Sequence, residues 1–208
     1  MSVTAKRGHR RPREAGAGAE GNERLTALTG AFLLVGFAIE GVTILSLHRL
    51  LTLHFFLGML LIGPVALKIG STCYRFARYY TGAAPYVRKG PPAPLLRVLG
   101  PLVILTSLAV LGTGVMLAVT GPLPGNWLLL HKASFVLWFA VMAIHVLAYA
   151  WRVPRILLGT AAPGGGRVVV PGGARRWLLL GLSLAGGLLI ALLTVHLVTP
   201  WHSGVIGG

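Results

Sequence analysis

The chain has 208 residues, of which 55% are hydrophobic and 11% are charged, and its mean hydropathy is +0.77. Soluble domains carry about 25% charged residues, so the composition excludes an ordinary soluble protein and predicts a membrane protein. There are 19 Lys and Arg residues against 4 Asp and Glu residues, but the cations gather in a tail and two loops. We therefore expect membrane lipid as a partner and no nucleic acid.

The predicted elements begin with a basic, Gly- and Ala-rich tail over residues 1–24, which we expect to be disordered and cytoplasmic. After it come about five apolar stretches, each long enough to cross a hydrocarbon core about 30 Å thick. They lie near residues 25–47, 50–72, 95–119, 128–151 and 177–198. The sequence thus predicts an all-α, polytopic membrane helical bundle over residues 25–199, with a short external tail over 200–208.

Basic residues predict the orientation of this bundle. They concentrate in the tail and in the second and fourth loops, whereas the first and third loops carry little beyond Arg49 and Lys132. This alternation is typical of proteins whose basic loops stay in the cytoplasm. We expect a multi-pass protein of the inner (plasma) membrane, with a cytoplasmic N-terminus.

Cys73 is the sole cysteine, so the chain has no internal disulfide and no cysteine set for covalent haem or an iron–sulfur cluster. We interpret it as an inert thiol at the inner end of the second span.

Ionisable residues inside spans cost several kcal/mol unless they are paired, which makes them functional candidates. They are distributed in two layers. The predicted outer leaflet holds Glu40, His54, His131 and His196, and the inner end holds Lys68 and His145.

His54 and His131 lie at equal depth on the second and fourth spans, which run in the same direction. Neutral imidazole is a usual axial ligand of haem iron, so this pair predicts a bis-histidine haem b site in the outer leaflet. Gly58, one turn below His54, would leave room for a porphyrin edge. The alternative is that each histidine caps a helix end or hydrogen-bonds a neighbour.

His145 follows His131 by fourteen residues, which places both on one helix face, roughly 21 Å apart along the axis. This spacing suggests a second haem near the inner surface. The fourteenth residue after His54 is Lys68, which would be either an unusual ligand or a side chain extending to the cytoplasmic interface. His145 would then serve a five-coordinate haem or only pack.

Two further residues are expected next to the outer ligands. Glu40 has three interpretations: a hydrogen-bond partner of an outer histidine, a proton carrier at a quinone site, or a buried structural acid. His196 is expected near the same site from the fifth span.

At Leu53–Gly58, Lys68–Gly82 and His131–His145 the chain resembles bacterial cytochrome b/b6 and cytochrome b561-like integral membrane proteins. The resemblance covers residues 50–151 and departs at Lys68, where the family pattern has a histidine. It implies b haems held between histidines of a helical bundle, and electron transfer between quinones and partner redox proteins.

These observations lead us to expect an electron-transfer or anchor subunit of an oxidoreductase rather than a stand-alone enzyme. Two alternatives stay open. One is a haem-free structural membrane subunit. The other is a transporter or metal-handling protein in which Glu40, His54, His131 and His196 form an outer-leaflet transition-metal site.

Overall fold

The computed structural model describes residues 14–90, 94–122, 125–158 and 170–204, and this part of the chain is helical without any β-strand. Within it, five helical stretches are long and apolar enough to cross a membrane: Gly18–Ile44, Leu47–Tyr80, Arg97–Thr120, Trp127–Tyr149 and Gly173–His202. The predicted all-α membrane bundle is therefore confirmed. Its helices are α1 (Glu14–Ile44), α2 (Leu47–Tyr80), α3 (Ala84–Lys89), α4 (Pro94–Thr120), α5 (Trp127–Tyr149), α6 (Arg152–Leu158), α7 (Gly173–Thr194), the 3-10 helix η1 (Val195–Val198) and α8 (Thr199–Gly204).

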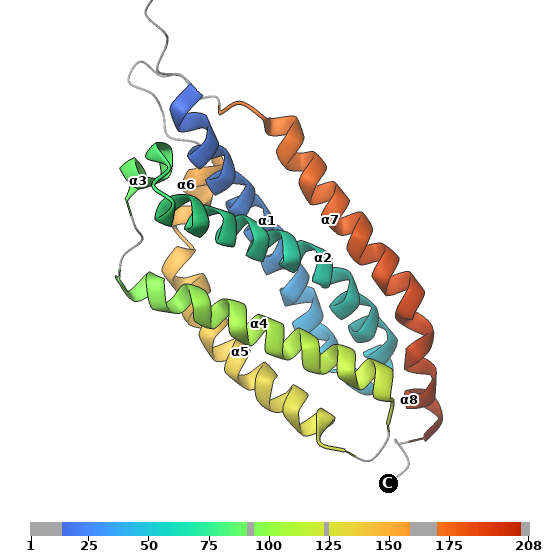
Figure 1. The fold of residues 1–208 in the computed structure, drawn as a ribbon. Coiled ribbons are helices and arrows are strands. Elements are labelled where there is room, and N and C mark those ends of the chain that lie inside the picture. The colour runs from blue at the N-terminus through green and yellow to red at the C-terminus, as the bar shows by residue number, and fades with distance from the viewer. Residues whose placement is uncertain (1–13, 91–93, 123–124, 159–169, 205–208) are drawn as a thin grey trace, which may run out of the picture.

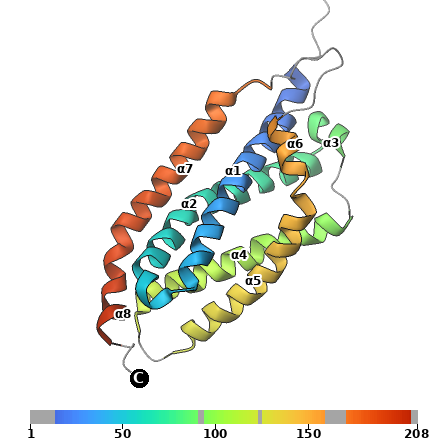
Figure 2. The ribbon, with the colours of Figure 1, turned by 180° about the vertical axis from the view of Figure 1, so that it is seen from behind.

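The long helices are arranged around the α1–α2 hairpin. Helix α7 packs along α2, and α4 pairs with α5 on the other side of the hairpin (Figures 1 and 2). Helices α1, α4 and α7 run from the end that carries α3 and α6 towards the end that carries α8, and α2 and α5 run back. We call these the α3/α6 end and the α8 end. Because α2 and α5 are parallel, residues near their starts lie at the same end of the bundle.

Helices α2 and α7 approach each other closely at two glycines. A Cβ atom added to Gly63 would lie 1.9 Å from the carbonyl oxygen of Ser183, and one added to Gly187 would lie 2.0 Å from that of Leu60. No larger residue fits either position without moving a backbone. Small residues that allow such contact are typical of helix pairs in membranes.

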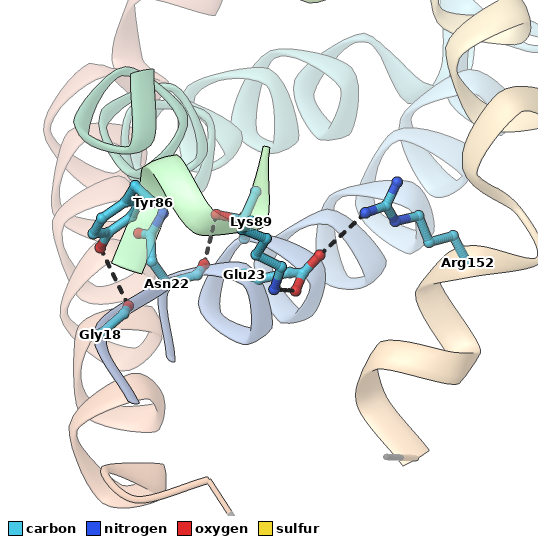
Figure 3. A network of polar contacts seen from close by, with 7 residues as sticks. Gly18, Asn22, Glu23, Tyr86, Lys89 and Arg152 are labelled. Carbon is cyan, nitrogen blue, oxygen red and sulfur yellow. Dashed lines mark hydrogen bonds and ion pairs between the residues drawn. The ribbon is translucent and has the colours of Figure 1, made fainter. Parts of the chain in front are cut away.

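The α3/α6 end is held by polar contacts that extend α1 beyond the predicted span. Residues 14–24 were expected to be disordered, but α1 begins at Glu14, so that expectation is wrong for this stretch, while residues 1–13 lie outside the described part. Glu23 contacts Lys89 of α3 and lies 3.4 Å from Nη2 of Arg152, at the start of α6 (Figure 3). Asn22 donates a hydrogen bond to the carbonyl oxygen of Ser71 on α2, 3.0 Å away. These contacts stabilise a helix where composition alone suggested a loose tail.

Tyr86 adds a further contact at this end. Its hydroxyl donates to the carbonyl oxygen of Gly18, 3.2 Å away (Figure 3). Burial raises the pKa of the Tyr86 phenol, which keeps this donor protonated. Through this bond α3 is attached to the start of α1.

Helix α2 continues to Tyr80, eight residues past the predicted end of the second span. Its end is set by Thr81, whose backbone N–H bonds back to the helix, and by Gly82, which has a φ of +75°. Glycine adopts this left-handed conformation without strain. Arg75 and Arg78, which follow the predicted span over residues 50–72, therefore lie on the last turns of α2.

Short helices also occupy the connections between the predicted spans and the stretch after the last of these spans. Helices α3 and α6 lie in the second and fourth loops, and α8 covers much of the predicted external tail. Two stretches lie outside the described part: residues 159–169 of the fourth loop and residues 205–208 of that tail.

Candidate functional site

His54 faces the last turns of α1 because the tight turn between Ile44 and Leu47 folds α2 back along α1. Nδ1 of His54 lies 2.9 Å from Oγ1 of Thr43 and 3.1 Å from Oε1 of Glu40. The side chains of His54 and Glu40 are only 23% and 14% exposed. Glu40 and Thr43 are three residues apart and so share one face of α1. Glu40 thus lies in contact with His54, and its interpretation as a hydrogen-bond partner of an outer histidine stays a prediction.

The hydrogen bonds of Thr43 determine which nitrogen of His54 carries the proton. The Thr43 hydroxyl donates to the carbonyl oxygen of Glu40 at 2.5 Å, so towards His54 it can only accept. Nδ1 of His54 is then the donor to this hydroxyl group, and Oε1 of Glu40 lies 3.1 Å from the same nitrogen. We assign the Nδ1–H tautomer, which leaves the lone pair on Nε2 and makes that atom a potential ligand.

His131 is held in the same way by the preceding helix. Its Nδ1 lies 3.1 Å from Oγ1 of Thr113 on α4, whose own proton goes to the carbonyl oxygen of Ala109 at 2.8 Å. Oγ of Ser134 lies 3.0 Å from the Thr113 hydroxyl. Thr113 therefore accepts from His131, and Nε2 of His131 bears a lone pair as well.

The structure brings His54 and His131 together at the α8 end. Their ring centroids lie 6.5 Å apart and the ring planes meet at 76°. The two histidines come from different hairpins, α1–α2 and α4–α5. This juxtaposition is the central feature of the candidate site.

Two glycines lie beside this pair. A Cβ added to Gly114 on α4 would be 3.2 Å from Cε1 of His131, so glycine lets that ring sit close to α4. A Cβ added to Gly58 would be 3.4 Å from Oε1 of Glu40. Gly58, predicted to make room for a porphyrin edge, thus lies against the Glu40 carboxyl. Gly114 was not anticipated, because nothing in the sequence relates it to His131 before α4 and α5 are paired.

Further from the α8 end than the histidine pair, an aromatic contact joins the two hairpins. The rings of Phe37 on α1 and Trp138 on α5 have centroids 4.8 Å apart, and Nε1 of Trp138 donates to Oγ of Ser107 on α4 at 3.0 Å. Trp138 lies midway in sequence between His131 and His145 and is buried. The sequence analysis did not single it out, because an apolar helix face offers no signal that separates a bridging tryptophan from a core one.

The layer near the α3/α6 end is organised differently. Nζ of Lys68 donates to the carbonyl oxygen of Thr26 on α1 at 2.5 Å. A Cβ atom added to Gly30 would lie only 2.7 Å from this Nζ atom, so the glycine leaves room for the lysine side chain. Lys68 thus extends towards α1 and ties α2 to it. His145 stacks beside Tyr149 with ring centroids 4.8 Å apart, and its buried Nδ1 has no hydrogen-bond partner among the described residues. An inner haem between Lys68 and His145 stays a prediction to which these contacts add no support.

Two further histidines lie at the α8 end. His196 is exposed on η1, and no contact in the described structure joins it to Glu40. Nε2 of His202 on α8 lies 2.9 Å from Oγ1 of Thr52, a contact that sequence spacing did not reveal. No group of three His, Cys, Asp or Glu side chains in the described ranges is arranged to hold a metal ion. The alternative of a four-residue transition-metal site gains no support from this geometry.

Comparison with known proteins adds no identification: no protein family, curated protein or solved structure matches the chain.

Proposed function

We propose that this protein is a membrane-embedded b-type cytochrome that holds one haem b between His54 and His131. The observation that supports this is the pairing of two imidazoles from separate hairpins, each with Nδ1 held by a preceding helix. A histidine that binds a metal usually donates its other ring N–H to a carboxylate, a carbonyl or a similar acceptor. Both histidines meet this condition without any rearrangement.

The spacing of the rings fits the same cofactor. The ring centroids of His54 and His131 lie 6.5 Å apart, so the Nε2 atoms of the two rings would be able to bind one metal ion. Nδ1 of His145 has no hydrogen-bond partner among the residues that the structure describes, so we propose one haem and regard a second at His145 as the weaker expectation.

A bound haem would supply reversible one-electron chemistry. The chain itself would orient the imidazoles and surround the site with apolar helices. The electron would come from a quinol or a reduced redox protein and leave to an oxidised member of either class. Oxidation of a quinol releases two electrons and two protons, so one quinol would serve two turnovers.

We place the protein in the inner (plasma) membrane, with the basic α3/α6 end in the cytoplasm and the histidine pair near the outer surface. The basic residues of the tail and of the loops at this end support that orientation. The chain would then act as the electron-transfer or anchor subunit of an oxidoreductase.

The test is an optical spectrum of the purified protein, expressed with adequate haem, in its oxidised and dithionite-reduced forms. We expect a Soret band and about one haem per chain. His54→Ala and His131→Ala should each lose the haem, whereas His145→Ala and His48→Ala should keep it. His48 is the matched control, since it is an exposed histidine on the first turn of α2.

Two outcomes would contradict the proposal. One is a helical wild-type protein, by circular dichroism, that shows no Soret band. The other is a haem that survives His54→Ala but is lost in His145→Ala. The first result would favour the haem-free structural subunit.

A further inference from the structure

Helices α1 and α7 both begin at the α3/α6 end, and they bring two arginine side chains together there (Figures 1 and 2). The guanidinium group of Arg176 on α7 lies against α1, because a Cβ atom added to Gly21 would be only 3.6 Å from its Nη1 atom. Arg24 follows Gly21 by three residues and so shares that face of α1. The guanidinium groups of Arg24 and Arg176 are close enough to repel each other. Two helices thus place like charges side by side.

The backbone before α7 holds the Arg176 guanidinium in this position. Its Nη1 donates to the carbonyl oxygen of Pro171 at 2.8 Å, and its Nη2 donates to that of Val170 at 3.1 Å. A guanidinium group has five N–H donors, so others remain for a ligand. The fold therefore fixes where this cation lies.

The start of α7 is an unfavourable place for cations. Arg175 and Arg176 both lie near it, and the first turn of this helix contains no acidic residue. The N-terminal end of a helix carries a partial positive charge, which repels cations and attracts anions. An anion beside these side chains would relieve this repulsion together with the repulsion between the two helices.

The acidic residues of α1 leave this place positively charged. We call Arg24, Arg175 and Arg176 the arginine cluster. Glu23 contacts Lys89 of α3 and Arg152 of α6 (Figure 3). Glu20, one turn before Arg24, adds one negative charge on the α1 side. Three cations against one carboxylate leave a net positive charge.

The residues that follow the cluster on α7 indicate what kind of anion fits. Trp177 comes directly after Arg176 and is exposed. Exposed tryptophans of membrane helices lie at the level of the lipid headgroups. Leu178 and Leu182 are also exposed, and they follow Arg175 by three and seven residues, so all three share one helix face. Cations at headgroup level above an apolar stripe match a phospholipid.

We infer that the arginine cluster binds the phosphate group of an anionic phospholipid such as phosphatidylglycerol, with an acyl chain along Leu178 and Leu182. The general excess of basic residues at the α3/α6 end attracts an anionic leaflet as a whole. That attraction does not require α1 and α7 to hold two guanidinium groups close together, whereas a phosphate group between them does. The lipid would join the starts of these two helices, and this inference does not depend on haem.

The experiment measures binding of a fluorescent phosphatidylglycerol to the purified full-length protein in detergent. Unlabelled phosphatidylglycerol should displace the probe, whereas phosphatidylcholine should not. Inorganic phosphate at the same concentration should not displace it either, since it has no acyl chain for the leucines. We expect the double variant Arg24→Gln/Arg176→Gln to weaken binding about thirtyfold, at about fivefold for each cation near an anionic headgroup.

The matched control is the double variant Arg78→Gln/Arg155→Gln. It removes the same charge from the same end, at exposed arginines of α2 and α6. We expect its affinity for the probe to stay within about twofold of the wild type, because neither side chain belongs to the cluster. Should the first double variant not fold, Arg175→Gln replaces it, with an expected loss of about fivefold.

Three results would overturn the inference. The first is equal displacement by phosphatidylcholine, which would show that only the apolar surface binds lipid. The second is equal weakening in the control variant, which would reduce the effect to the overall charge of this end. The third is displacement by inorganic phosphate, which would make a soluble anion the occupant.

Discussion

Threonine hydroxyls occur repeatedly in this protein and serve two different purposes. Most of them donate to a carbonyl oxygen one turn earlier on their own helix, as Thr29 and Thr106 do. Such bonds satisfy the hydroxyl group where no water is available. Thr43 and Thr113 make the same bond but use a lone pair to accept from a histidine. These two threonine side chains thereby fix the tautomers of His54 and His131.

Thr113→Val tests this role at the residue scale. Valine cannot accept from His131, so we expect the affinity for haem to fall about tenfold, the lower range for loss of a ligand's hydrogen-bond partner. The measurement is a haem titration of the apoprotein in detergent. Thr106→Val is the control, because Thr106 lies buried on the same helix and bonds only to its own backbone. Equal losses in the two variants would show that the effect is structural.

At the scale of elements, the crossing of α2 and α7 depends on the absence of side chains. Gly63 and Gly187 allow each backbone to contact the other, and Ala191, one turn after Gly187, is fully buried. Pro64 follows Gly63 directly and is also buried. The close approach thus occurs at a buried stretch of α2, where a larger side chain would have no free space.

Gly63→Ala should therefore destabilise the bundle. The new Cβ would meet backbone atoms of α7, which cannot move as a flexible side chain does. We expect a loss of about 3 kcal/mol in the free energy of unfolding, at the upper range for overpacking. Thermal unfolding in detergent, followed by circular dichroism, measures the loss.

Gly186→Ala provides the comparison. It lies next to Gly187, but a Cβ there meets nothing within 4 Å. Alanine has the higher helix propensity, by about 1 kcal/mol, so this variant should be unchanged or more stable. A melting temperature that falls as far as that of Gly63→Ala would contradict the account of the crossing.

At the scale of the whole molecule, the two ends of the bundle differ in chemistry. The α3/α6 end carries the ion pairs of Glu23 and most of the basic loop residues. The α8 end carries the histidine pair. This polarity predicts which end faces the cytoplasm.

Cysteine labelling checks the orientation. In a Cys73→Ala background, Asn126→Cys places a thiol in the exposed turn before α5, and Thr81→Cys places one in the exposed turn after α2. An impermeant maleimide should label the Asn126→Cys variant in intact cells and the Thr81→Cys variant only after lysis. The reverse pattern would place the histidine pair at the cytoplasmic surface.

Much of this architecture follows from the sequence, because an apolar run of about 20 residues has one stable form in a bilayer. The five spans and the shared depth of His54 and His131 were predictable for that reason. The role of Thr113 and the direction of Lys68 were not, since they depend on which helices become neighbours. The helical start of α1 was missed because Glu23 is stabilised by Lys89 and Arg152, both distant in sequence.

Each histidine of the pair receives its hydrogen-bond partner from the helix that comes just before it in the chain, His54 from α1 and His131 from α4. During synthesis, each helical hairpin can therefore prepare its own ligand as soon as it enters the bilayer, without waiting for the other. In the described residues, the α1–α2 hairpin meets α4, α5 and α6 through two ring contacts, apolar side chains and the Glu23–Arg152 ion pair. A cofactor that takes both nitrogens would join two finished parts, so assembly of the site would resemble the association of two subunits more than the folding of one chain.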